Sequence, residues 1–145
     1  MAESKHTDLL FVYGTLMHDA NPQLSFNLQD YGKNRKQATF RGKLYDVGSY
    51  PAAIASDQET DKIFGELYKL TNPELAFVEL DVYEGYRPKD NEESDYIRKV
   101  VTVYTLSEQK AVKAWIYLYN KSVDKLSPIP GGNYIEYLQT RSSSE

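Results

Sequence analysis

Hydrophobic and polar residues alternate along several segments of this chain, a pattern typical of β-strands with one buried face. Between residues 37 and 47, for example, Ala38, Phe40 and Leu44 fall on one face and polar side chains on the other. Residues 8–13, in which apolar residues follow Asp8 without interruption, predict a further, buried strand. The alternating segments that we predict to be strands are 37–47, 62–69, 96–106 and 111–119, the last two forming an antiparallel hairpin.

Helices are predicted at three places. Asn72 can cap a helix that has Pro73 at its first position, where no backbone N–H is needed, and Gly85 ends it. Residues 24–31 carry leucine and tyrosine at helical spacing before a glycine, and 133–139 predict one or two helical turns. Strands outnumber helices and their order is mixed, so the predicted fold class is α+β with a largely antiparallel sheet or barrel.

The chain has 145 residues, a length that fits a single domain with a substantial core. We expect one domain over 1–145, with frayed ends at 1–7 and 140–145. Thirteen tyrosines are the unusual feature of the composition. Aromatic rings suit half-buried pleated surfaces, so they favour a β-rich fold.

Charge and composition exclude several classes of function. A net charge of −4 without a basic block argues against nucleic acid as a partner, and "KNRK" at 33–36 is interpreted as a solvated loop. The chain has no cysteine, which removes thiolate catalysis, disulfides and cysteine-based zinc sites. Two histidines are too few for a histidine-rich metal site. A carboxylate site for magnesium or calcium stays open, although no EF-hand spacing is present.

No apolar run approaches the roughly 20 residues that cross a bilayer. The first residues, "MAESKHTD", lack the apolar stretch of a signal peptide. We therefore expect a cytoplasmic protein with no membrane partner.

Glu84 interrupts the pattern of the helix that begins at Pro73. Phe77 and Leu80 lie seven and four positions before it, so the three side chains share a face that should point at the core. Burial disfavours the charged form of a carboxylate, and the negative end of the helix dipole has the same effect. We expect a raised pKa for Glu84.

Two interpretations of this carboxylate remain open. Glu84 could be a partly exposed helix-end residue, or the partner of Arg87 or Arg98 in a salt bridge. Alternatively, it could be a general acid/base whose pKa is tuned by its surroundings. Asp81, three positions earlier, could flank the site, but we expect it to face solvent or to cap local backbone.

The segment "LFVYGTL" at 10–16 ends a strand in a way that suits anion binding. A strand that stops at Gly14 can turn sharply and expose consecutive N–H groups, which bind a carboxylate or stabilise an oxyanion. Thr15 adds a hydroxyl donor. Taken alone, the same sequence is also compatible with an ordinary strand end.

Several short motifs occur together in order along the chain. They are "VYGTL" at 12–16, "LYDVGSYPA" at 44–52, "ELDVYEGY" at 79–86, "YIRKVVTV" at 96–103, and the later "AWIYLYN" and "GGNYIEYL". The set resembles the gamma-glutamylcyclotransferase (AIG2-like) family over roughly 9–138. The resemblance implies a small mixed, mainly antiparallel β-barrel with flanking short helices.

The resemblance also implies a site. Glu84 would be the catalytic base, and the loop at the end of the first strand would cradle the gamma-glutamyl group. The loop positions carried over are Tyr13, Gly14, Thr15 and Leu16, with a threonine where serine is commoner. Further tyrosines line the cavity in such enzymes, and the candidates in this chain are Tyr96, Tyr117 and Tyr119.

The activity implied by the resemblance is intramolecular. A gamma-glutamyl substrate would close on itself to 5-oxoproline and release an amine or amino acid, with no cofactor or metal. The substrate could be glutathione, a gamma-glutamyl amino acid or a gamma-glutamylamine, and a monomer is compatible with this chemistry. "RPKDNEESD" at 87–95 could border the leaving group or be a solvated loop. The alternative function is a non-catalytic binding module for gamma-glutamyl-like metabolites on the same fold.

Overall fold

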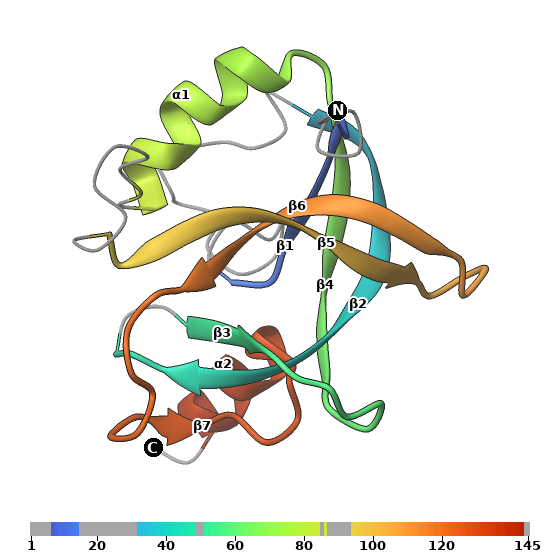
Figure 1. Ribbon diagram of the computed structural model, residues 1–145. Helices are drawn as coiled ribbons and strands as arrows, with labels where there is room; N and C mark the ends of the chain where they lie inside the picture. Colours follow the sequence, from blue (N-terminus) through green and yellow to red (C-terminus); the bar gives the residue numbers. More distant parts are fainter. Residues whose placement is uncertain (1–6, 15–31, 49–50, 85, 87–93, 144–145) are drawn as a thin grey trace.

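The computed structural model describes residues 7–14, 32–48, 51–84, 86 and 94–143, and for 34–35, 82–84 and 140–143 it describes the backbone alone. Within this part of the chain the strands are β1 (Leu9–Val12), β2 (Gly32–Asp46), β3 (Pro51–Ala55), β4 (Lys62–Leu70), β5 (Tyr96–Thr105), β6 (Ala111–Tyr119) and β7 (Ser127–Pro128). The helices are α1 (Pro73–Glu84) and α2 (Tyr134–Ser143) (Figure 1).

Five of these strands close into a barrel. Neighbours follow the order β2, β4, β1, β6, β5, and β5 pairs back with β2, where Ala38 lies opposite Thr105. β1 and β6 are parallel, with Leu10 beside Trp115, and the other barrel pairs are antiparallel. β3 and β7 add to the second half of β2 outside this ring. The fold is therefore the small mixed, mainly antiparallel barrel that the family resemblance implied.

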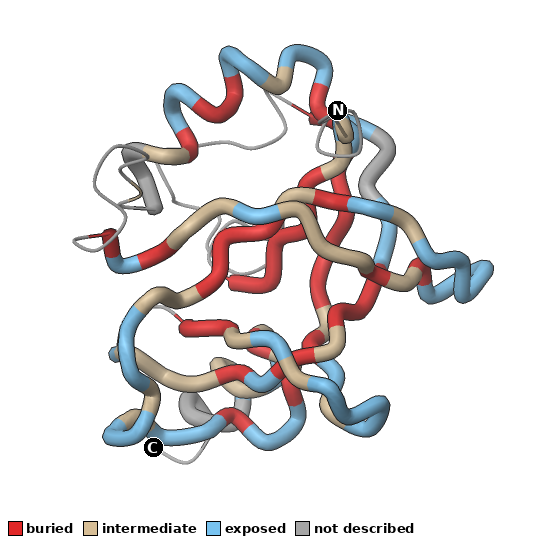
Figure 2. Tube along the Cα trace, viewed as in Figure 1, coloured by how far each residue is buried: buried red, intermediate tan, exposed pale blue. Residues whose placement is uncertain are grey.

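Buried residues concentrate on the barrel strands (Figure 2). The Phe11 ring lies against Tyr13 and Phe40, with ring centroids 6.5 and 6.4 Å away. Gly65 on β4 makes room for this cluster, because a Cβ there would lie 2.3 Å from the Val12 carbonyl oxygen and 2.7 Å from the Phe11 ring. The absence of a side chain at Gly65 lets β4 and β1 approach closely around an aromatic core.

α1 packs one face on the barrel. Ala76, Phe77 and Leu80 are buried, whereas Leu75 and Val78 on the other face are exposed. This confirms the prediction that the stripe containing Phe77 and Leu80 points at the core. Burial of that face, rather than intrinsic propensity, supplies most of the stability of so short a helix.

Both ends of α1 have the predicted bounds. The Asn72 side-chain oxygen accepts a hydrogen bond from the Leu75 N–H at 3.2 Å, as an N-cap does. At the other end the Tyr86 N–H donates to the Asp81 carbonyl at 2.8 Å. A bond over five positions is the longer of the two that close a Schellman motif, and it ends the helix after Glu84.

The prediction of a solvated loop at 33–36 is wrong, because these residues belong to β2. Lys33 lies opposite Lys69 and Lys36 opposite Leu67, with a shift of register between them. Main-chain hydrogen bonds to β4 hold this polar segment, and such bonds do not require apolar side chains.

The remaining differences concern short or terminal elements. The alternation does not predict β3 or β7, since neither segment alternates apolar with polar residues. α2 spans 10 residues, longer than the one or two turns predicted, and it includes residues 140–143 that were expected to be frayed. Residues 24–31, predicted as a helix, lie outside the described part of the chain. No helix in the described part is both long and apolar enough to cross a bilayer.

Candidate active site

β1 leads into a tightly held strand end. The Tyr13 hydroxyl donates a hydrogen bond to the Tyr117 carbonyl at 2.6 Å, and its ring is buried. Gly14, the next residue, lies against Pro51, because a Cβ at Gly14 would be 2.6 Å from the proline Cγ. The glycine of the predicted loop is therefore required by a close neighbour within the protein.

Two of the predicted tyrosines form a cross-strand pair close to this strand end. Tyr96 on β5 lies opposite Tyr119 on β6, and their rings meet edge to face with centroids 5.4 Å apart. The buried Tyr96 hydroxyl donates to the Pro51 carbonyl at 2.7 Å. The Pro51 carbonyl thus accepts the hydrogen bond from Tyr96, and the Pro51 ring lies beside Gly14. These two contacts link the tyrosine pair to the end of β1.

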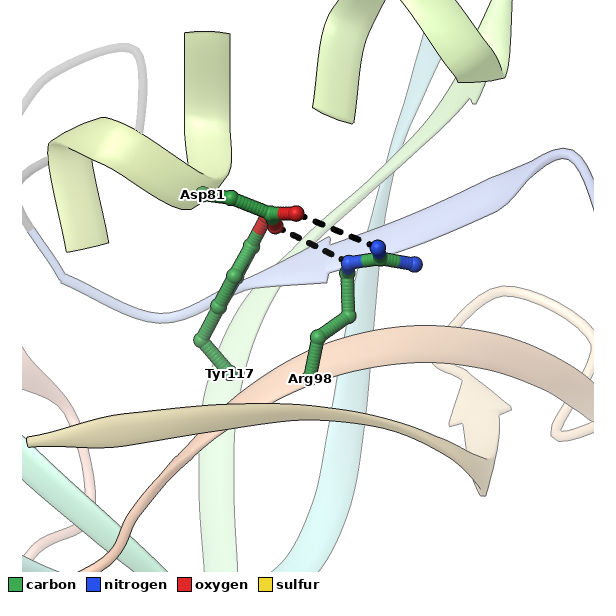
Figure 3. Close-up of polar contacts among 3 residues, drawn as sticks. All are labelled: Asp81, Arg98 and Tyr117. Carbon is green, nitrogen blue, oxygen red and sulfur yellow. Dashed lines mark hydrogen bonds and ion pairs between the residues drawn. The ribbon is translucent and has the colours of Figure 1, made fainter. Parts of the chain in front are cut away.

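Asp81 has a different role from the one expected. Its carboxylate accepts two hydrogen bonds from Arg98, Nε to Oδ1 at 3.0 Å and Nη2 to Oδ2 at 3.2 Å. The Tyr117 hydroxyl donates to Oδ1 at 2.5 Å (Figure 3). The prediction that Asp81 faces solvent or caps backbone is wrong, because its side chain is only 16% exposed and both partners come from β5 and β6.

The direction of α1 follows from two contacts. Phe77 meets the ring of Trp115 edge to face at 5.4 Å, and Asp81, one turn later, meets Tyr117. The helix therefore advances in the direction of β6, toward Tyr119. Its last residue, Glu84, ends α1 at the end of the barrel where β1 and β6 finish and β5 begins (Figure 1).

Some predicted site residues cannot be placed in this way. Thr15 and Leu16 lie outside the described residues, as do Arg87 and most of the segment 87–95. For Glu84 the backbone is described but the side chain is not. Arg98, one of the two salt-bridge partners considered for Glu84, is bound to Asp81.

Sequence reasoning missed a buried carboxylate on β4. Glu66 is 3% exposed, lies opposite Val12 on β1, and accepts a hydrogen bond from the Tyr68 hydroxyl at 3.2 Å. Buried carboxylates are rare unless they have polar partners. The available signal was an acidic residue with aromatic residues two positions away on either side, Phe64 and Tyr68, which share its face in a strand.

The described residues also outline a cavity of about 420 Å³ elsewhere on the barrel, away from α1. It lies between the second half of β2, the start of β4 and the segment 128–132, and none of the predicted site residues lines it. We place the candidate site at the end of β1 because the predicted site residues that the structure describes in full gather there, namely Tyr13, Gly14, Tyr96 and Tyr119. Among the described residues no cluster of three histidine or acidic side chains could hold a metal ion.

Comparison with known proteins identifies relatives over most of the chain. The sequence profile of the family described as "Gamma-glutamyl cyclotransferase, AIG2-like" matches residues 10–136. The chain is similar to the gamma-glutamylcyclotransferase family protein YtfP of Escherichia coli strain K12, with 30% identity over 137 residues. That match covers 88% of this chain and 96% of YtfP.

Solved structures share the fold. YkqA from Bacillus subtilis superposes with a TM-score of 0.67 at 27% identity, covering 97% of this chain, which spans 44% of YkqA. An AIG2-like protein from Mus musculus superposes with a TM-score of 0.63 at 20% identity, covering 90% of this chain and 95% of the mouse chain. The similarity to the mouse protein concerns the fold alone.

Proposed function

Because this chain belongs to the AIG2-like gamma-glutamylcyclotransferase family, we propose that it cyclises a gamma-glutamyl compound to 5-oxoproline, with Glu84 as the general acid/base. One observation carries the proposal. The contacts of Phe77 with Trp115 and of Asp81 with Tyr117 direct the end of α1, which bears Glu84, toward the end of the barrel that holds the Tyr13–Gly14 strand end and the Tyr96–Tyr119 pair (Figure 1). Glu84 and the Tyr13–Gly14 segment are positions that the family resemblance assigns to the reaction, and Tyr96 and Tyr119 are its candidates for lining the cavity.

The reaction replaces one bond between carbon and nitrogen by another. The α-amine of the substrate attacks its own γ-carbonyl carbon, a five-membered ring forms, and the bond from the γ-carbon to the leaving amine breaks. Because nucleophile and electrophile belong to one molecule, holding the substrate folded supplies much of the rate. No protein nucleophile is needed, which suits a chain without cysteine.

Proton transfer is the task proposed for Glu84. The carboxylate accepts a proton from the α-ammonium group before attack and later donates it to the leaving amine. It then takes up the second proton, which the attacking nitrogen loses as the lactam forms. The C-terminal end of α1 favours the neutral carboxyl group, so we expect its pKa above the ordinary value of about 4.3. A base of this kind can exchange protons near neutral pH.

The loop that follows β1 is proposed to hold the γ-glutamyl group. Main-chain N–H groups from Gly14 through Thr15 and Leu16 would bind the substrate carboxylate or the developing oxyanion. The bond from Tyr13 to Tyr117 and the contact of Gly14 with Pro51 support this role, because they fix the start of the loop. Tyr96 and Tyr119 would border the same space.

A product assay tests the proposal. Purified protein is incubated with glutathione, with γ-glutamyl amino acids and with γ-glutamylamines, and 5-oxoproline and the released amine are quantified. We expect at least one compound to give both products in equal amounts. Saturable binding of such compounds without any turnover would contradict the proposal and indicate the binding module instead.

A further inference from the structure

The carboxylate of Asp81 is the centre of a polar network that the proposed chemistry does not use. It accepts three hydrogen bonds, two from Arg98 and one from the Tyr117 hydroxyl, and both ion-pair side chains are less than one-fifth exposed. A two-pronged arginine contact fixes orientation as well as distance. The network therefore sets how α1 sits on β5 and β6.

Aromatic rings hold the Arg98 guanidinium in place. Its Cζ atom lies 4.0 Å from the centre of the Phe77 ring and 4.7 Å from that of Trp115, with Tyr86 at 5.7 Å. A guanidinium stacked in this way has little freedom to leave Asp81. Arg98 is thus suited to holding α1 rather than to receiving a substrate carboxylate.

Tyr117 joins the helix to the strand end. Its hydroxyl binds Asp81 on α1, and its carbonyl accepts the hydrogen bond from Tyr13 at the end of β1. The Asp81 carbonyl also accepts the Tyr86 N–H that closes the helix. A continuous chain of contacts therefore connects Tyr13 with the last turn of α1.

We infer that Asp81, Tyr117 and Arg98 are positioning residues of the reaction, setting the place of Glu84 relative to the Tyr13–Gly14 strand end. This inference rests on the proposed function. Glu84 follows Asp81 by three residues, about 4.5 Å along a helix axis, so a shift of Asp81 carries Glu84 with it. A displacement of about 1 Å can cost on the order of 100-fold in rate.

Tyr117→Phe is the test, because it removes one hydroxyl and leaves the ring in place. A matched control exists in Tyr137→Phe, since the Tyr137 hydroxyl donates to the Asp46 carboxylate, also at 2.5 Å and partly buried, between α2 and β2. We expect both variants to fold with similarly lowered melting temperatures. kcat should fall at least about tenfold in Tyr117→Phe with KM changed less than about twofold, and stay within about twofold of the wild type in Tyr137→Phe.

A second variant tests the contact between Arg98 and Asp81. Arg98→Lys keeps the positive charge but cannot make the two-pronged contact, so we expect the same fall in kcat with KM preserved. Wild-type kcat in both Tyr117→Phe and Arg98→Lys would overturn the inference while the proposed function stood. A loss confined to KM would overturn it too, by indicating direct substrate contact. If the wild-type protein released no 5-oxoproline from any of the γ-glutamyl compounds, the proposed function and this inference would both be overturned.

Discussion

At Gly14 the barrel leaves no room for a side chain. The ring of Pro51 occupies the space, and the Pro51 carbonyl in turn accepts the Tyr96 hydroxyl. A single steric contact thus couples the strand end of the candidate site to a tyrosine on β5. Because the proline is anchored through its carbonyl, it has little freedom to yield.

We expect Gly14→Ala to lower the free energy of unfolding by about 1–3 kcal/mol, the usual cost of overpacking. The added Cβ would lie 2.6 Å from Cγ and 2.9 Å from Cδ of Pro51. Urea denaturation checks the value. Gly131→Ala is the matched control, since a Cβ there meets no atom within 4 Å, and its effect should stay below about 1 kcal/mol. Equal effects of the two substitutions would contradict the steric explanation.

Helix α1 is stabilised at its start, along one face and at its last turn. Asn72 caps its start, a buried face of Ala76, Phe77 and Leu80 packs on the strands, and the Asp81 contacts fix its last turn. Its orientation along β6 brings its end to the end of β1. Substitutions can therefore test the cap at the start of α1 and the Asp81 contacts of its last turn separately.

Asn72→Ala should destabilise the protein by about 1 kcal/mol, because an N–H of the first turn loses its acceptor. Thermal or urea unfolding gives the value. Asn72→Asp keeps a side-chain oxygen at the same place and adds a negative charge at the helix start, so it should retain wild-type stability. If the aspartate variant lost as much stability as the alanine variant, the capping explanation would fail.

The sequence predicts those elements whose own residues show alternation or helix-capping signals. The β5–β6 hairpin alternates apolar with polar residues, and Asn72 and Pro73 indicate the start of α1. Residues 33–36 and strand β3 could not be predicted, because their strand character comes from partners, β4 for one and β2 for the other. Neither the polar segment 33–36 nor the apolar β3 alternates, so neither gives a local signal of the distant strand that pairs with it.

For the whole molecule, closure of five strands creates the candidate site. Tyr13 and Tyr117 are 104 positions apart in sequence, and Asp81 lies 36 positions from Tyr117, yet all three join in one chain of hydrogen bonds. Sequence analysis could name the Tyr13–Gly14 strand end through the family motif. It could not assign Asp81 to Arg98, since that pairing depends on where α1 packs against β5.

Two variants of α1 test whether Glu84 transfers the proton in a cyclisation at this end of the barrel. Glu84→Gln and Glu79→Gln remove the charge from two glutamates of α1, and Glu79 is exposed. The rate of 5-oxoproline release is measured under saturating substrate, with folding checked by circular dichroism. We expect a loss of about 100-fold or more in Glu84→Gln, with Glu79→Gln close to wild type. A folded Glu84→Gln variant that binds substrate and turns over within a few-fold of the wild-type rate would contradict it.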